Sequence, residues 1–121
     1  MALKLRKKVL PPPGCPMSAC MSLLGGAWTP EIIWNLSEGA RRFSELRRAM
    51  PKISAKVLSA RLKDLDERGV LVRSVLPTTP PSVDYGLTDL GEELIPAIRA
   101  IVEVGSKLHL RLMSSAASRA A

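Results

Sequence analysis

The side chains of greatest chemical interest lie between residues 54 and 68, where polar and apolar side chains recur with the period of a helix. Leu58, Leu62 and Leu65 form the apolar stripe. The opposite stripe consists of Lys56, Ser59, Ala60 and Lys63. Lysine ammonium and serine hydroxyl groups bind phosphate oxygens or base edges, and small residues allow a close approach. The pattern therefore predicts a face that binds DNA, although a solvated helix with ordinary charges has similar spacing.

The ends of this helix are marked by residues with known terminal preferences. Ser54 is the predicted N-cap, and Gly69 is predicted to end the helix in the left-handed conformation. Ala55 and Lys56 follow the cap, where free backbone N–H groups and the positive end of the helix dipole favour a phosphate. Arg61 flanks the apolar stripe. It fits a DNA contact as well as an ion pair with a nearby carboxylate, that of Glu45 or Asp64.

The net charge of the chain is concentrated around the same helix. The 121 residues carry a formal charge of +7, which favours an anionic partner without specifying one. Residues 41–73 contain ten lysine and arginine side chains against four carboxylates, a surplus of six. Almost all of the excess positive charge is therefore expected in one part of the fold.

Two further elements must position this helix. Ser44 is the predicted N-cap of a short helix that runs through Met50 and exposes Arg47 and Arg48. Pro51 ends this helix before a turn that contains Lys52. After Gly69, two β-rich runs at 70–76 and 83–87 flank a loop at 77–82 that contains three prolines. Prolines exclude a tight two-residue hairpin, so we expect a stiff, protruding loop, the wing. Its hydroxyl groups belong to Thr78, Thr79 and Ser82.

The remaining helices are expected on both sides of this unit. Apolar spacing predicts a helix over residues 16–24. Thr29 is the predicted N-cap of a second helix, with Pro30 at its first position, and this helix is expected to close near Gly39. Thr88 is the predicted cap of a last long helical region, with a kink at Pro96. Trp28 and Trp34 are interpreted as core anchors rather than ligand contacts.

The chain contains two cysteines and one histidine. Cys15 precedes Pro16 at a predicted helix start, close in sequence to Lys7 and Lys8, a setting that lowers a thiol pKa. It is a candidate redox sensor or an inert thiol, and Cys20 is interpreted as a small core residue. His109 and the cysteines offer too few ligands for a metal site.

The division of the chain follows from these patterns. Residues 1–13 are predicted to form a flexible basic arm, residues 14–113 a single domain, and residues 114–121 a frayed tail. No segment approaches the roughly 20 apolar residues that span a bilayer, so a cytoplasmic protein without membrane contact is expected. The expected fold class is α+β, mainly α: a winged helix-turn-helix with additional helices at both ends.

Several spaced motifs resemble the HxlR-type branch of the MarR-like bacterial transcription regulators. The resemblance covers about residues 15–105. The motifs are Cys15-Pro16, LGGAWT at 24–29, RFSELRR at 42–48, ISAKVLSARL at 53–62 and PPSVDYGLTDLG at 80–91. Two positions depart from the family pattern. Members of the family usually have a basic residue at the position of Ala27 and often one at the position of Ser82. Ser82 therefore argues against a strong arginine contact from the wing to the minor groove.

The resemblance implies a homodimeric regulator that binds an inverted-repeat operator in double-stranded DNA. The first and last long helices would form the dimerisation surface, with Met17, Met21, Leu94, Ile98, Ile101, Val102 and Leu108 as the candidate interface residues. The candidate DNA-binding residues are Ser54, Ala55, Lys56, Ser59, Ala60, Lys63, Arg47, Arg48, Lys52, Arg61, Thr78, Thr79 and Ser82. Cys15 occupies the position at which some members of the family sense electrophiles or oxidants.

The sequence bears on three classes of function. A DNA-binding regulator without cofactors is favoured, with a thiol-reactive signal or a small-molecule effector as its possible input. The alternative is a winged-helix module that binds another protein and uses its basic face only for solvation. An enzyme is disfavoured, since the sequence has neither a glycine-rich phosphate loop nor a recognisable Ser, His and acid arrangement.

Overall fold

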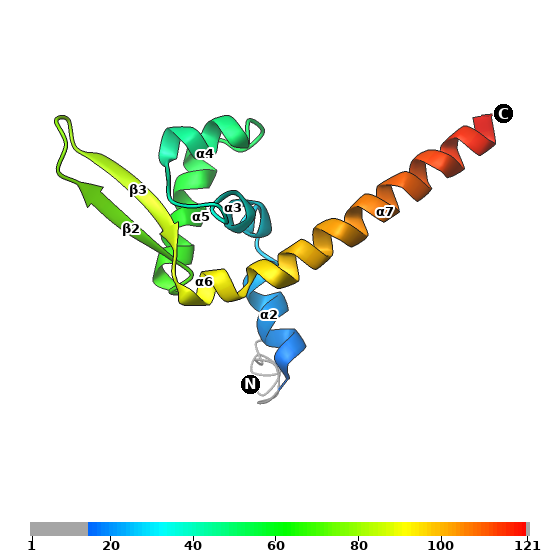
Figure 1. Cartoon of the computed structure of the whole chain (residues 1–121), viewed down its shortest axis with the longest axis horizontal. Helices are drawn as coiled ribbons and strands as arrows, with labels where there is room; N and C mark the ends of the chain where they lie inside the picture. Colours follow the sequence, from blue (N-terminus) through cyan, green and yellow to red (C-terminus); the bar gives the residue numbers. More distant parts are fainter. Residues whose placement is uncertain (1–14, 121) are drawn as a thin grey trace, which may run out of the picture.

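The computed structural model describes residues 15–120, and within that range helices dominate over one small sheet (Figure 1). The elements in chain order are α2 (Pro16–Leu24), α3 (Thr29–Asn35), β1 (Arg41–Arg42), α4 (Phe43–Ala49), α5 (Ala55–Glu67), β2 (Leu71–Leu76), β3 (Ser82–Leu87), α6 (Asp89–Glu93) and α7 (Ile95–Ala120). The expected winged helix-turn-helix with flanking helices is confirmed. The predicted basic arm at 1–13 lies outside the described residues.

The sheet is antiparallel, with the strand order β1-β3-β2. Leu71 pairs with Leu87 and Leu76 with Ser82, so the β2–β3 hairpin keeps one register to its tip. Arg41 and Arg42 form a two-residue strand, β1, that pairs with β3. The base of the wing is thereby attached to the segment between α3 and α4.

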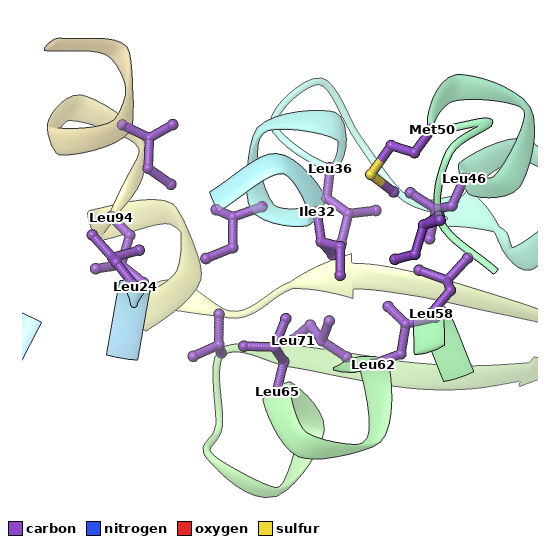
Figure 2. Packing of buried hydrophobic residues seen from close by; sticks show 14 residues of the cluster. Leu24, Ile32, Leu36, Leu46, Met50, Leu58, Leu62, Leu65, Leu71 and Leu94 are labelled. Atoms are coloured by element: carbon purple, nitrogen blue, oxygen red, sulfur yellow. The ribbon is translucent and has the colours of Figure 1, made fainter. Parts of the chain in front are cut away.

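The core lies between the helices and the inner face of this sheet (Figure 2). The following core residues are each no more than 2% exposed: Ile32 of α3 and Leu36 directly after it, Leu58 and Leu62 of α5, and Leu71 of β2. Helices α2, α3, α4, α5 and α7 each contribute at least one buried side chain to the core. Trp28 and Trp34 are half-buried against this cluster, as predicted for core anchors. The orientation of α5 is therefore determined by contacts from most of the fold.

Two predicted helix caps are confirmed. The Ser54 hydroxyl accepts a hydrogen bond from the Val57 N–H at 3.1 Å, and the Thr88 hydroxyl accepts one from the Gly91 N–H at 3.2 Å. Gly69 follows α5 with φ +77°, the left-handed conformation expected there. The first turns of α5 and α6 are thus closed by their own side chains.

Two other predicted caps are wrong. Thr29 is the first residue of α3 rather than its cap, and at 2% exposure its side chain is part of the interior. Ser44 lies inside α4, whose start is closed by the Glu45 carboxylate accepting from the Arg42 N–H at 2.8 Å. The prediction at Thr29 rests on its residue type and on Pro30 and Glu31 after it, and the prediction at Ser44 rests on its residue type. At α4 the acid in the first turn already provides the missing acceptor.

The last helical region differs from its prediction at both ends. It breaks at Leu94 rather than at Pro96, because Pro96 is the second residue of α7, where a missing backbone N–H costs nothing. Helix α7 continues through Ala120, whereas we expected a frayed tail after Met113. In Figure 1 its C-terminal part extends away from the body of the molecule.

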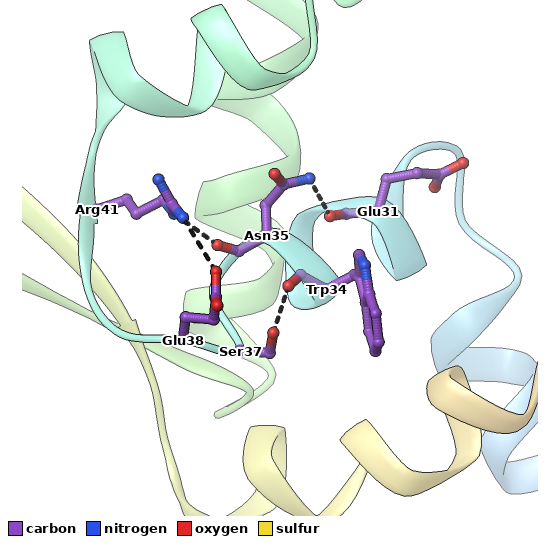
Figure 3. A network of polar contacts seen from close by, with 6 residues as sticks. All are labelled: Glu31, Trp34, Asn35, Ser37, Glu38 and Arg41. Carbon is purple, nitrogen blue, oxygen red and sulfur yellow. Dashed lines mark hydrogen bonds and ion pairs between the residues drawn. The ribbon is translucent and has the colours of Figure 1, made fainter. Parts of the chain in front are cut away.

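Polar contacts hold the connection from α3 to β1 (Figure 3). The Arg41 guanidinium donates from Nε to the Asn35 carbonyl at 2.8 Å and lies 3.7 Å from the Glu38 carboxylate. The Ser37 hydroxyl donates to the Trp34 carbonyl at 2.7 Å. Helix α3 ends at Asn35, and this turn continues to Gly39, the predicted closing residue. The contacts place β1 beside β3 and so support the wing.

Candidate nucleic-acid interface

Helix α5 presents two chemically different faces. Leu58, Leu62 and Leu65 are at most 1% exposed and pack into the core. All four residues of the predicted polar stripe on the opposite side are exposed: Lys56, Ser59, Ala60 and Lys63. Because three leucines fix the rotation of the helix about its axis, the polar stripe is presented in one orientation. A helix held in this way suits insertion into a DNA groove.

The N-terminus of α5 differs in one respect from the expected phosphate site. The Ser54 oxygen already accepts the Val57 N–H, so its hydroxyl closes the helix as well as facing solvent. Ala55 is half-buried, and Lys56 is exposed one residue later. The contribution of this end to an anion contact therefore comes from the helix dipole and Lys56 more than from a free serine hydroxyl.

The basic residues before α5 are exposed. Arg47 and Arg48 stand on the solvent side of α4, whose inner side carries the buried Leu46. Lys52 is exposed in the turn between the two helices. The turn itself is anchored by Ile53, which is 2% exposed. These cations share the part of the molecule from which α5 starts.

Arg61 does not form the ion pair that the sequence suggested as one alternative. Asp64 lies 3.4 Å from Arg68 instead, and Glu45 accepts the Arg42 N–H. Arg61 is half-buried, and its Nη1 lies 3.5 Å from the position that a Cβ on Gly26 would occupy. Its side chain therefore lies against the turn between α2 and α3. The remaining alternative, a DNA contact, stays a prediction.

The wing loop uses two of its three hydroxyl groups internally. The Thr78 hydroxyl donates to the Pro80 carbonyl at 2.7 Å and lies 3.2 Å from the Ser82 hydroxyl. Thr79 is exposed and makes no hydrogen bond within residues 15–120. The predicted hydroxyl contacts to phosphate are therefore weakened at Thr78 and Ser82, whose oxygens stabilise the loop.

Sequence inspection missed Arg73 as a candidate site residue. Arg73 is exposed on β2 and pairs in register with Tyr85 on β3. It belongs to the basic segment 41–73, but its residue type alone indicates no specific contact. The period-two alternation from Leu71, a core residue, could have identified the face on which it stands.

Cys15 occupies the N-cap position of α2 and is half-buried. Its Sγ lies 3.0 Å from the Ser18 hydroxyl oxygen. The Ser18 hydroxyl, helped by the backbone N–H groups of Ser18 and Met17, holds the pKa of the Cys15 thiol below its ordinary value. The predicted neighbours Lys7 and Lys8 lie outside the described residues. Cys20 is exposed, so its prediction as a core residue is wrong.

The predicted dimerisation residues fall into two groups. Leu94 and Ile98 are 7% and 2% exposed and belong to the core of the single chain, so their assignment to a partner-facing surface is wrong. The others lie on the surface with between 42% and 74% of their area exposed: Met17, Met21, Ile101, Val102 and Leu108. Helical spacing located the apolar stripe that leads into α7. It did not show which part of the stripe is buried by the chain itself and which part is exposed.

Two classes of site are not formed by the described part of the chain. Within residues 15–120, no three His, Cys, Asp or Glu side chains gather closely enough to hold a metal ion. Over the same range, no helix is long and apolar enough to cross a membrane.

Known proteins are similar to this chain in sequence and in fold. A model of the HxlR-like helix-turn-helix family matches residues 23–112. The uncharacterised HTH-type transcriptional regulator YdeP of Bacillus subtilis is 35% identical over 108 residues, covering 89% of this chain and 84% of YdeP. The structure of the redox regulator HypR in its oxidised form superposes with a TM-score of 0.73 at 32% identity, covering 77% of this chain and 96% of HypR. The reduced transcriptional regulator YodB of Bacillus subtilis superposes with a TM-score of 0.67 at 38% identity, covering 74% and 87% of the two chains.

Proposed function

The chain belongs to the HxlR-like helix-turn-helix family of DNA-binding transcription regulators, and on this premise we propose that it acts as a homodimer on an inverted-repeat operator. Helix α5 is the recognition helix in this proposal. The observation that carries it is the orientation of α5, with a fully buried leucine stripe opposite the exposed Lys56, Ser59 and Lys63. We assign the chain no catalytic role.

The dimer is supported by the exposed apolar side chains of α2 and α7. Met17, Ile101 and Leu108 are more than half exposed in the single chain, which would leave an extended apolar surface in water. In a twofold dimer the two recognition helices would enter successive major grooves about 34 Å apart. An inverted repeat in the DNA follows from that symmetry.

Removal of two lysines from α5 tests the recognition helix. The change Lys56→Ala with Lys63→Ala is expected to weaken binding to the promoter of the chain's own gene by on the order of 2 kcal/mol or more, because two charge-assisted contacts are lost. The measurement is a gel shift, with thermal unfolding as the check on folding. The matched control is Arg99→Ala with Lys107→Ala, which removes the same charge from α7 and is expected to leave affinity unchanged.

Salt dependence separates this function from the alternative, a module that binds another protein. A DNA-binding protein with several phosphate contacts loses affinity steeply as salt rises, because counterions are released on binding. Unchanged affinity in the double lysine variant, or a flat salt profile with promoter DNA, would exclude α5 as the recognition helix.

A thiol-reactive input is the second part of the proposal. It is supported by the lowered pKa of Cys15, which raises its thiolate fraction, and by the similarity to the redox regulator HypR. An oxidant or electrophile that reacts with this thiolate is expected to release the protein from DNA, and Cys15→Ser should abolish that release. Cys20→Ser is the control and should retain it. Release that persists in the Cys15 variant removes Cys15 from the mechanism and favours a small-molecule effector bound elsewhere.

A further inference from the structure

The tip of the wing carries no charge. Residues 77–82 are Pro-Thr-Thr-Pro-Pro-Ser, and the hydroxyls of Thr78 and Ser82 are engaged with the loop itself. Phosphate contacts that add substantial affinity come mostly from arginine and lysine. If the wing contributes electrostatically to DNA binding, the charge must therefore come from its strands rather than from its tip.

The two strands of the wing contain two charged side chains, Arg73 on β2 and Asp84 on β3. They stand on opposite faces of the sheet, because Arg73 pairs in register with Tyr85 whereas Asp84 pairs with Ser74. The Asp84 carboxylate lies 3.9 Å from the guanidinium of Arg42, a residue of β1. This ion pair compensates the one negative charge on the strands of the wing.

Arg73 stands on the face of the sheet that also carries Leu71 and Leu87. Leu71 is 1% exposed and packs in the same core as the leucines of α5. This is the inner face of the sheet, and it points toward the recognition helix. Arg73 is the next residue after Leu71 on this face in the direction of the tip, and it is exposed. Arg73 forms no ion pair within the described part of the chain. Its guanidinium is available to an anion next to α5.

We propose that Arg73 is the phosphate contact of the wing, and that the proline-rich tip contributes shape but no charge. The proposal rests on the proposed function, since it requires α5 to face DNA. With α5 in a major groove, the inner face of the adjacent hairpin lies toward the flanking sugar-phosphate backbone, where a guanidinium donates to phosphate oxygens. Such a contact adds affinity for any sequence and does not discriminate between bases.

The test uses three variants of the full chain: Arg73→Ala, Arg73→Met and Arg73→Lys. Binding is followed by fluorescence anisotropy with a labelled duplex that carries the promoter of the chain's own gene, over a series of KCl concentrations. Arg73→Ala and Arg73→Met are expected to lose about tenfold in affinity and to lower the salt slope by about 0.9, the value for one phosphate. Arg73→Lys keeps the charge and is expected to retain most of the affinity. Arg99→Ala on α7 removes one exposed arginine away from the wing, serves as the control and is expected to bind as the parent does.

The outcomes separate this proposal from the one on which it rests. If the double lysine variant of α5 loses affinity while Arg73→Ala binds as the parent does, the role of Arg73 is excluded and the recognition helix stands. If Arg73→Met binds as well as the parent, the charge is unnecessary and the proposal is also excluded. If neither the lysine variant nor Arg73→Ala changes affinity, the recognition helix itself is wrong. Thermal unfolding of each variant shows whether the fold is intact.

Discussion

Helices α5 and α7 both carry an apolar stripe of helical period, but only one of the stripes is covered by the chain itself. In α5, Leu58, Leu62 and Leu65 are at most 1% exposed. In α7, Leu108 and Leu112 are 54% and 60% exposed. The two helices therefore offer different surfaces to partners: α5 a cationic and polar face, and α7 an apolar one.

One apolar stripe begins at Leu94 and continues along α7, and its side chains change from buried to exposed along its length. Leu94 and Ile98 are buried, and the alternating spacing of four and three residues then continues over the exposed part through Ile101, Gly105, Leu108 and Leu112. Such spacing is typical of the seam between two helices. In the proposed function, the polar exposed face of α5 contacts DNA. The apolar exposed face of α7 contacts a second copy of the chain.

The largest effect is expected from a cavity in the buried leucine stripe of α5. Leu62→Ala in α5 is expected to lower the free energy of unfolding by about 2–5 kcal/mol, because it removes buried methyl groups and leaves a cavity. Urea unfolding followed by circular dichroism measures it. Ser59→Ala on the exposed face of the same helix is the control, expected within about 0.5 kcal/mol of the parent. Equal effects of the two changes would contradict the two-faced description of α5.

A smaller effect is expected from the uncovered stripe. Leu108→Glu places a carboxylate in the proposed seam and is expected to raise the dimer dissociation constant by about tenfold or more, since a charge would be desolvated without a partner. Sedimentation velocity over a series of protein concentrations measures the change. The unfolding of the monomer should be little altered, because this position makes no contribution to the core.

The matched control on α7 is Leu110→Glu. Leu110 is 66% exposed and stands two residues from Leu108, on the other side of the helix. Its substitution is expected to leave the dissociation constant unchanged. A parent protein that is monomeric at micromolar concentration, or two glutamate variants that dissociate equally, would contradict the assignment of the seam.

Local signals predicted much of the fold. Ser54 and Thr88 were identified as caps, and Gly69 as the residue past the end of α5, because each position has a strong preference that acts within a few residues. The wing followed from alternation on both sides of a proline-rich loop. The exposed face of α5 followed from its period. All of these depend on short-range chemistry that the sequence displays directly.

The errors arose where a residue has more than one possible partner. Thr29 resembles a cap by type, yet its side chain is buried by long-range packing. Cys20 has helical spacing on α2, but the side of α2 that the body covers is decided elsewhere in the fold. For Leu94 and Ile98, periodicity marked an apolar stripe without showing whether the same chain or another one covers it. Side-chain type and spacing therefore predict which residues share a helix face better than they predict what that face packs against.

The break at Leu94 has a mechanical consequence. Helix α7 has 26 residues, which at about 1.5 Å per residue gives a rod about 39 Å long. The body of the chain holds this rod near one end, through Ile98. A tilt of about 10° at the α6–α7 junction would move the far end relative to the body by about 7 Å, roughly a fifth of the DNA repeat of about 34 Å. In a dimer joined along α7, a small change of angle at this junction would therefore change the spacing between the two recognition helices. That spacing determines how well the two helices fit their operator.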